Sequence, residues 1–365
     1  MAIVTDGATR HQAEIPALDG LRALAITIVM CSHVGLQNVM PGQFGVTLFF
    51  FLSGYLITTL LRREFEQHGR ISFRQFYLRR AVRILPPMYI TIAFLAVLSL
   101  IGVIHPLSWI GVPFDLAFLT NYFSVSGVPI GLWSLAVEEH FYVAFPLLLW
   151  MLARRFSMAQ CAIVLVGLCA IVLGVRLSEA QRVVDLKDIN FWTHTRIDSI
   201  LFGSILALWN NPVIDRKDVL PKGVAGYLLA TALLLPTFTI RDEAFRQTYR
   251  YTIQGCGLLV LFNVAIRDTG VVAAALNNQL TRQIATLSYT LYLVHTGMIM
   301  AFSPADGTHP VAATLGAFAA SIAYALAMHR WIERPLNNRR RQIEQSWRHD
   351  QTSVVSDAPQ PENGA

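Results

Sequence analysis

Residues 43–62 read QFGVTLFFFLSGYLITTLLR, an apolar run whose one charged residue, Arg62, stands at its end. A helix of this length spans about 30 Å, the thickness of the hydrocarbon core of a bilayer. Comparable runs recur along the 365 residues, of which 54% are hydrophobic and 14% are charged. Soluble domains carry about 25% charged residues. The sequence therefore predicts an all-α, polytopic integral membrane protein.

The apolar runs predict about ten transmembrane helices. We expect them near residues 16–36, 43–62, 85–104, 133–152, 159–177, 191–209, 222–240, 251–267, 284–302 and 309–330. Residues 105–132 are apolar but interrupted by proline and glycine, which favours a long non-cytoplasmic or re-entrant loop. Residues 1–14 then form a cytoplasmic N-terminal segment and residues 15–335 the transmembrane domain. Residues 336–365 form a polar cytoplasmic tail, for which we expect disorder and no appended soluble catalytic domain.

Lysine and arginine predict the orientation of these helices, because they concentrate in cytoplasmic loops. With the N-terminus in the cytoplasm, 22 of the 29 Lys and Arg residues fall on the cytoplasmic side and six on the opposite side. Both termini are therefore expected in the cytoplasm. The net charge of +6 follows from this topology and indicates no nucleic-acid partner. The sequence does not indicate an oligomeric state.

The first polar feature within a predicted span is the pair Arg22 and His33 in LDGLRALAITIVMCSHVG, residues 18–35. Eleven residues are close to three helical turns, so both side chains share one face, about 16 Å apart along the axis. A neutral imidazole is suited to proton transfer near pH 7. The alternative is that Arg22 extends to the interface and that His33 bonds a neighbouring carbonyl.

The second feature is FYLRRAVRILPPMY, residues 76–89, with Pro86 and Pro87 at the expected start of the third span. If the preceding residues are helical, Arg79, Arg80 and Arg83 share a face. They would then form a cytoplasmic fork that binds phosphate groups through paired N–H donors. The alternative is contact of these arginines with lipid headgroups.

The third feature is GLWSLAVEEHFYVAFP, residues 131–146, in which Ser134, Glu138 and Tyr142 share a face at i, i+4 spacing. Adjacent residues on a helix differ by about 100°, so Glu138 and Glu139 cannot both point inward. One carboxylate is expected to face the protein and to pair with His33 or an arginine. The alternative is that the acids favour a helix N-terminus.

Two weaker sets follow, for which interhelical hydrogen bonding is the main alternative to substrate binding. HTRIDSILFGSILA places Arg196 and Asp198 in a span, where each is expected to neutralise a partner on another helix. LSYTLYLVH places Tyr292 and His295 in another span. The histidines and the four cysteines lack metal-ligand spacing, so we expect no metal.

These motifs occur together in an order that resembles the acyltransferase-3 family, integral-membrane acyltransferases that modify sugars and lipids. The first stretch resembles the family's R-x10-H signature, and the arginine-rich stretch resembles its R-x-x-R element. Further family blocks resemble GVTLFFFLSGYLIT, WSLAVEEHFY, RIDSILFGSILA, LSYTLYLVH and WIERP. The resemblance extends from about residue 15 to residue 335. It is a resemblance to the stand-alone form, without the C-terminal SGNH-type hydrolase domain that many relatives carry.

The resemblance implies roles for individual residues. His33 matches the family's essential histidine, which is either a general base or a transient acyl carrier. Arg22 matches the arginine of the same signature, and Glu138 or Glu139 matches an acidic element that orients or neutralises the histidine. The R-x-x-R element implies that the arginine fork faces the phosphates of acyl-CoA.

The resemblance implies an O-acyltransferase in a bacterial cytoplasmic (inner) membrane. Its donor substrate would be acyl-CoA, most often acetyl-CoA, with no permanently bound cofactor. The acceptor would be a hydroxyl of a cell-surface or exported polysaccharide, or of its lipid-linked precursor. One alternative is a transporter or flippase of a glycan or anionic solute, whose sign would be inverted repeats with paired broken helices. A purely structural membrane protein is the other.

Overall fold

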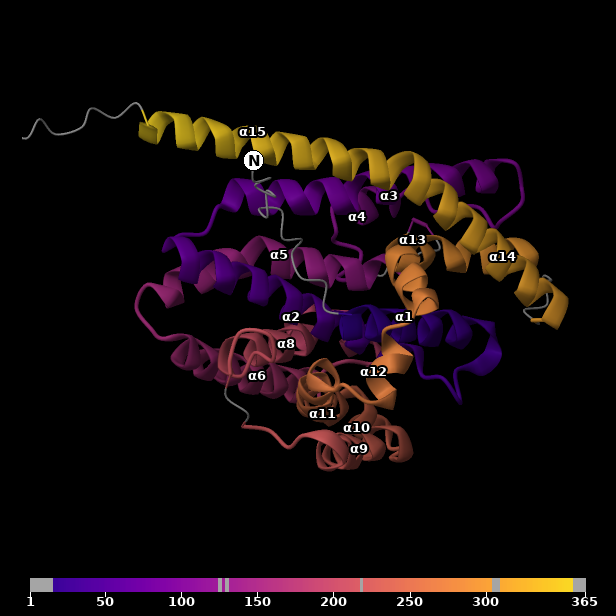
Figure 1. Ribbon diagram of the computed structural model, residues 1–365. Coiled ribbons are helices and arrows are strands. Elements are labelled where there is room, and N and C mark those ends of the chain that lie inside the picture. The colour runs from indigo at the N-terminus through magenta and orange to yellow at the C-terminus, as the bar shows by residue number, and fades with distance from the viewer. Residues whose placement is uncertain (1–15, 124–126, 129–130, 217–218, 304–308, 357–365) are drawn as a thin grey trace, which may run out of the picture.

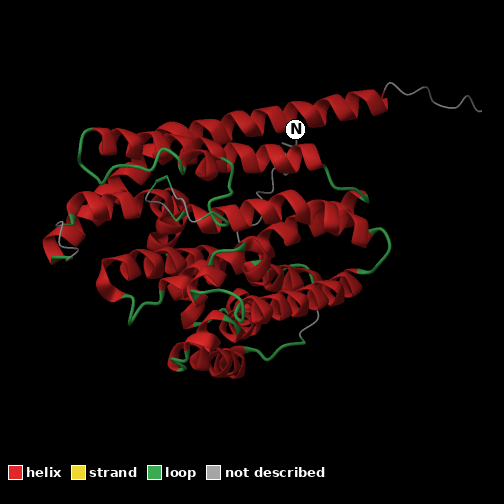
Figure 2. Cartoon of the chain, turned by 180° about the vertical axis from the view of Figure 1, so that it is seen from behind, coloured by secondary structure: helices red, strands yellow, loops and turns green. Residues whose placement is uncertain are grey.

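The computed structural model describes residues 16–123, 127–128, 131–216, 219–303 and 309–356 (Figures 1 and 2). These residues form helices joined by loops, and no strand occurs among them. The predicted all-α fold is therefore confirmed. The expected cytoplasmic segment 1–14 and the end of the tail, residues 357–365, lie outside the described residues.

Among the described residues, seven helical stretches are long and apolar enough to cross a membrane. They are α1 (Pro16–Cys31) with the π-helical turn η1 (Ser32–Leu36), α2 (Gly42–His68), α3 (Phe73–Leu100), α5 (Leu132–Ala153), α6 (Met158–Glu179), α13 (Gln279–Phe302) and α14 (Val311–Met328) with its continuation. Each corresponds to an expected span. These seven establish a multi-pass membrane protein, whereas the count of about ten and the sides of the termini stay predictions.

The other three expected spans correspond to shorter or less apolar helices: α8 (Asp198–Trp209), α9 (Gly223–Thr239) and α11 (Tyr249–Arg267). The span expected at 191–209 is divided at Ile197 into α7 (Thr193–Arg196) and α8. A twelve-residue helix such as α8 is about 18 Å long, too short to cross the hydrocarbon core alone. The remaining short helices are α4 (Val112–Leu116) in the expected loop, η2 (Leu186–Asn190), α10 (Glu243–Gln247) and α12 (Val271–Leu276).

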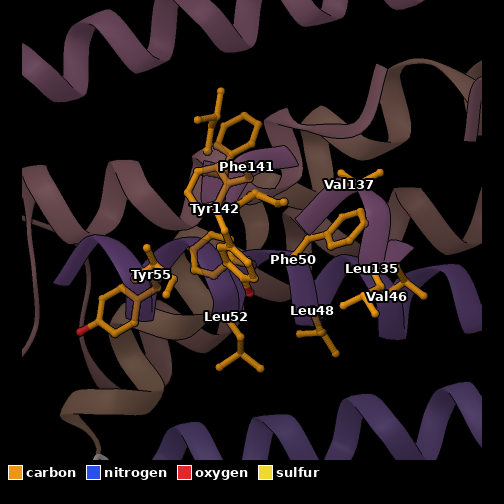
Figure 3. Packing of buried hydrophobic residues seen from close by; sticks show 14 of the residues in the cluster. Val46, Leu48, Phe50, Leu52, Tyr55, Leu135, Val137, Phe141 and Tyr142 are labelled. Atoms are coloured by element: carbon orange, nitrogen blue, oxygen red, sulfur yellow. The ribbon is translucent and has the colours of Figure 1, made fainter. Parts of the chain in front are cut away.

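Helix α2 occupies the core and packs most closely against α8. A side chain at Gly54 would meet the Ile200 carbonyl oxygen at 1.9 Å, and one at Gly203 would meet the Phe51 carbonyl oxygen at 2.1 Å. Small residues allow membrane helices to approach this closely. Figure 3 shows the other side of the core, where apolar side chains of α2 pack with those of α5.

Helix α3 begins at Phe73, before the two prolines, and not at Pro86 as expected. The arginine-rich residues therefore belong to the same helix as the apolar span. The condition for the arginine fork, a helix through residues 79–83, is met.

The C-terminal part differs from the expectation of a disordered tail. Helix α14 continues through the π-helical turn η3 (His329–Glu333) into α15 (Arg334–Ser356). In both views α15 runs alongside α3, and the two helices are in contact (Figures 1 and 2). Residues 336–356 are therefore helical, and they cover one side of α3.

Candidate active site

Two connected cavities lie among the described helices. The inner cavity, of about 110 Å³, is lined by residues of α1, α2, α3, α5 and α13. The outer cavity, of about 420 Å³, is lined by residues of α1, α2, α3, α13, η3 and α15. Both are lined by Arg22, Arg80, Arg83, Ser288 and Tyr289. The two cavities therefore adjoin at these five residues, which include three arginines and are called the arginine ring below.

The arginine fork of α3 forms one wall of this ring. Arg80 and Arg83 line both cavities, and Arg79 lines the outer one, 3.8 Å from Glu64. The Arg80 guanidinium lies over the ring of Tyr142, 5.2 Å from its centroid, a cation–π contact. Among the described residues, Arg80 and Arg83 form no ion pair with a carboxylate. Their N–H donors are thus available to an anion in the cavities.

Arg22 approaches the same ring from α1. Its Nη1 lies 3.4 Å from Asp19 Oδ1, at the long end of the hydrogen-bond range. Its other donors face the two cavities together with the fork. Helix α1 thus adds a third guanidinium to the pair from α3.

Glu138 is the carboxylate that faces the inner cavity. The Tyr142 hydroxyl donates to Glu138 Oε2 over 2.9 Å and lies 3.1 Å from Ser53 Oγ. Glu139 lines neither cavity, and its Oε1 is buried without a hydrogen-bond partner. The structure therefore separates the two carboxylates as the 100° step between neighbours predicted.

The far part of the inner cavity is formed by Ser134 and Tyr292. The Tyr292 hydroxyl contacts Ser134 Oγ and donates to the Gly131 carbonyl oxygen over 3.0 Å. The ring of Tyr292 also packs against that of His295, with 5.8 Å between the ring centroids. Of the weaker candidates, Tyr292 therefore lines the cavity and His295 lies directly behind it.

His33 lies outside both cavities, at the end of α1 where the chain turns. The turn depends on Gly35, whose φ of +88° is a left-handed conformation that favours glycine. The His33 side chain is exposed, and its ring meets the buried ring of His295 edge to face, with 5.1 Å between centroids. His33 and Tyr292 therefore both contact the ring of His295.

Backbone carbonyls determine the tautomers of both histidines. His33 Nδ1 lies 2.8 Å from the Val29 carbonyl oxygen, and His295 Nδ1 lies 2.8 Å from that of Tyr292. A carbonyl oxygen only accepts hydrogen bonds, so each Nδ1 carries the proton and each Nε2 is a base in the neutral ring. The expected hydrogen bond between His33 and Glu138 or Glu139 does not occur. The Val29 carbonyl orients the imidazole in its place.

Arg22 and His33 do not form a contact pair. Arg22 is at the arginine ring, whereas His33 belongs to the π-helical turn η1 that follows the C-terminal end of α1. The predicted alternative for His33, a hydrogen bond to a neighbouring carbonyl, is present. This bond leaves Nε2 exposed for chemistry.

Arg196 and Asp198 line neither cavity. Asp198 forms an ion pair with Arg176 of α6, and both side chains are fully buried. Arg196 lies over the Tyr251 ring, 3.5 Å from its centroid, and donates to Thr47 Oγ1 over 3.2 Å. Asp198 thus neutralises a partner on another helix, as the sequence predicted, and this cluster joins α2, α6, α8 and α11.

Several cavity residues were not found from the sequence. Ser53 was not singled out from the sequence as a site residue, yet it lies within hydrogen-bond distance of Tyr142 in the inner cavity. Ser288 lines both cavities. Arg340 and Arg341 of α15 line the outer cavity and lie in the segment expected to be disordered. The sequence feature that could have indicated Arg340 and Arg341 is the group of arginines that follows the last apolar span.

The fold and these cavities define a multi-pass membrane protein with a polar, arginine-rich site enclosed by its helices. A sequence model of the acyltransferase-3 family, described as an acyltransferase domain, matches residues 15–330. The chain therefore belongs to the acyltransferase-3 family of membrane proteins.

Individual relatives agree with this family. The chain is 31% identical over 358 residues to the protein named "Putative O-acetyltransferase SACOL0978" of Staphylococcus aureus (strain COL), covering 91% of this chain and 59% of that protein. It is 28% identical over 352 residues to "O-acetyltransferase OatA" of Staphylococcus aureus (strain NCTC 8325 / PS 47), covering 89% and 57% respectively. The chain thus spans less than two thirds of the length of these relatives. No solved structure shows significant similarity.

Proposed function

We propose that the protein is a membrane O-acyltransferase that transfers an acyl group, most simply acetyl, from acyl-CoA to a hydroxyl of a glycan or of its lipid-linked precursor. The observation that carries this proposal is the arginine ring between the two cavities. It joins an arginine-lined outer space to a narrow inner space that is lined by one carboxylate, three phenols and three serine hydroxyls.

The donor is expected to bind from the outer cavity. The phosphates of acyl-CoA would contact the guanidinium groups of Arg79, Arg80 and Arg83, which have donors to spare. The thin pantetheine arm would then extend through the arginine ring into the inner cavity. The excess of Lys and Arg expected on the cytoplasmic side supports an entrance from that side, where acyl-CoA is found.

His33 is the proposed general base for the acceptor. Its exposed Nε2 takes the proton from the acceptor hydroxyl, and the resulting oxygen nucleophile attacks the thioester carbonyl. The C–O bond of the new ester forms, the C–S bond breaks, and the CoA thiolate leaves and takes up a proton.

The position of His33 gives this scheme a direction. Donor groups enter at one end of α1, at Arg22, and the acceptor is activated at the other end, at His33. Between them lie Glu138 with Tyr142, Ser134 with Tyr292, and His295. This row of polar side chains supports passage of the thioester arm along the helix axis toward an acceptor on the opposite side.

A transfer assay with a matched control tests the proposal. Purified protein in lipid nanodiscs would receive radiolabelled acetyl-CoA and a candidate glycan acceptor, and acetyl ester would be counted. We expect His33→Ala to lower transfer by about 10²–10⁴-fold, and His105→Ala, an exposed histidine in a loop, to retain it. Full acetylation of the acceptor by the His33→Ala protein would refute the assigned role. If neither protein releases CoA with any acceptor, acyl-CoA is refuted as the donor.

A further inference from the structure

We propose that α15 forms one wall of the donor site and that Arg340 and Arg341 contact the phosphates of CoA. This inference rests on the proposed function and assigns a binding role to the segment that follows the last apolar helix. No family block that the sequence resembles includes these two residues, since the last of them, WIERP, ends at Pro335.

The residues of α15 that face the outer cavity follow helical spacing. Asn337, Arg340 and Arg341 line that cavity and stand at i, i+3 and i+4. These positions share one face of a helix, which α15 presents to α3. Arg334 and Arg339 of the same helix are exposed and do not line the cavity. Within residues 334–341, two arginines of α15 thus line the cavity and two do not.

The start of α15 is tied to the transmembrane bundle. In the π-helical turn η3, Glu333 accepts a hydrogen bond from Thr290 Oγ1 of α13 over 2.6 Å. The second oxygen of the same carboxylate lies 3.1 Å from His329 Nδ1. A π-helical turn changes the direction in which the following residues point. These bonds hold α15 at the mouth of the cavity, where its side chains face the arginines of α3.

The charges around the outer cavity favour a polyanion. Six arginines line it (Arg22, Arg79, Arg80, Arg83, Arg340 and Arg341), against the two lining carboxylates of Asp19 and Glu333. Two of the six also have a carboxylate nearby: Arg79 lies 3.8 Å from Glu64, and Arg340 lies 3.7 Å from Glu344. Like charges gathered in a concave site repel one another and attract a ligand of opposite sign. CoA presents a diphosphate and a separate 3′-phosphate, so its charges are spread over a length. The fork on α3 and the pair on α15 offer two groups of donors to two groups of phosphates.

The sizes of the two cavities agree with this division of the donor. The outer cavity, at about 420 Å³, lies within the usual range for small-ligand sites of about 300–1,000 Å³. The inner cavity, at about 110 Å³, is too small for a nucleotide and suits a thin chain. The nucleotide end of CoA would therefore stay between α3 and α15 while its thioester end passes inward.

The test is the affinity of the full-length protein for CoA in nanodiscs of neutral phosphatidylcholine. The variant is Arg340→Gln with Arg341→Gln, and the matched control is Arg334→Gln with Arg339→Gln, which removes two exposed charges of the same helix that do not line the cavity. We expect the variant to bind CoA about tenfold or more weakly, with the control and the unaltered protein alike. A variant with lysine at positions 340 and 341 keeps the charge and should regain part of the affinity.

The outcomes separate this inference from the proposed function. Equal CoA affinity in the variant and the control would overturn the role of α15 and leave the proposed function standing. Failure of the unaltered protein to bind CoA would overturn both. Reduced co-purification of anionic phospholipid by the variant, with unchanged CoA affinity, would assign the two arginines to a lipid headgroup and overturn the inference. A melting temperature equal to that of the control shows that the variant is folded.

Discussion

Arg176 and Arg80 both belong to membrane-spanning helices, but their surroundings differ. Arg176 is fully buried and paired with Asp198, and it donates to the carbonyl oxygens of Thr195 over 2.8 Å and Thr248 over 2.7 Å. Arg80 lies over aromatic rings at the junction of two cavities and forms no ion pair among the described residues. An arginine whose donors are all used stabilises the fold, whereas one that faces a cavity is available to a ligand. Arginine content alone does not distinguish these roles.

The largest effect is expected when the buried ion pair between Arg176 and Asp198 is broken. Arg176→Ala leaves the buried carboxylate of Asp198 without its partner, which costs about 3–5 kcal/mol of folding free energy. Thermal unfolding in detergent, followed by size-exclusion chromatography, measures the loss. Arg155→Ala is the control because Arg155 is exposed in a loop. If both variants melt at the same temperature, Arg176 is not a structural residue.

Substitution of one of two adjacent glutamates, Glu138, is expected to give the next largest effect. Glu138→Gln is expected to lower kcat for acyl transfer by about 100-fold, because Glu138 faces the inner cavity and holds Tyr142. Glu139→Gln is the matched control: it changes the same group one position along the helix, at a residue that lines neither cavity. Steady-state kinetics with acetyl-CoA measure both. A larger loss for the Glu139 variant would reverse the assignment of the two carboxylates.

A smaller effect is expected for His295, which contacts both Tyr292 of the inner cavity and His33, the proposed base. His295→Gln removes the ring that packs against His33, and the resulting misplacement of the base should lower kcat about tenfold with little change in KM for the donor. The pH dependence of kcat provides a second readout. If His295 positions His33, the apparent pKa of the acidic limb shifts in the variant. An unchanged kcat and an unchanged profile would exclude this positioning role.

The smallest effect concerns the ion pair between Arg62 and Asp215. Burial alone would raise the pKa of Asp215, but the hydrogen-bonded guanidinium of Arg62 outweighs it and holds that pKa below its ordinary value of 3.8. Because the folded-state pKa is lowered, this stabilisation is complete above the unfolded-state pKa and is lost as pH falls through the folded-state pKa. Asp215→Asn should cost about 1 kcal/mol near pH 7, since the carboxylate is partly exposed. Melting temperatures of the variant and the unaltered protein should converge in acid, and a constant difference down to pH 3 would contradict the pairing.

Helical periodicity is what made part of the site predictable from the sequence. The spacing of Ser134, Glu138 and Tyr142 placed their polar atoms on one face, and all three line the inner cavity. The same reasoning grouped the arginines of α3, which line the outer cavity together. Within one helix, the backbone geometry determines which side chains are neighbours, so sequence spacing suffices.

Contacts between helices were not predictable in this way. Nothing in the sequence near His33 indicates that its neighbour is His295, because that contact depends on how α1 packs against α13. The expected partner, a glutamate of α5, bonds Tyr142 instead. Helix α15 was missed for another reason. Its residues are too polar for a span, and its position depends on the continuation of α14 through η3 and on contact with α3.

The central claim is that donor binding and acceptor activation occur at opposite ends of α1. The most direct test is equilibrium binding of radiolabelled acetyl-CoA to the unaltered protein, to Arg80→Gln and to His33→Gln, with acyl transfer measured on the same preparations. The account predicts that His33→Gln binds acetyl-CoA normally and transfers almost none, while Arg80→Gln binds it about tenfold or more weakly. Normal binding by Arg80→Gln, or lost binding by His33→Gln, would contradict the account.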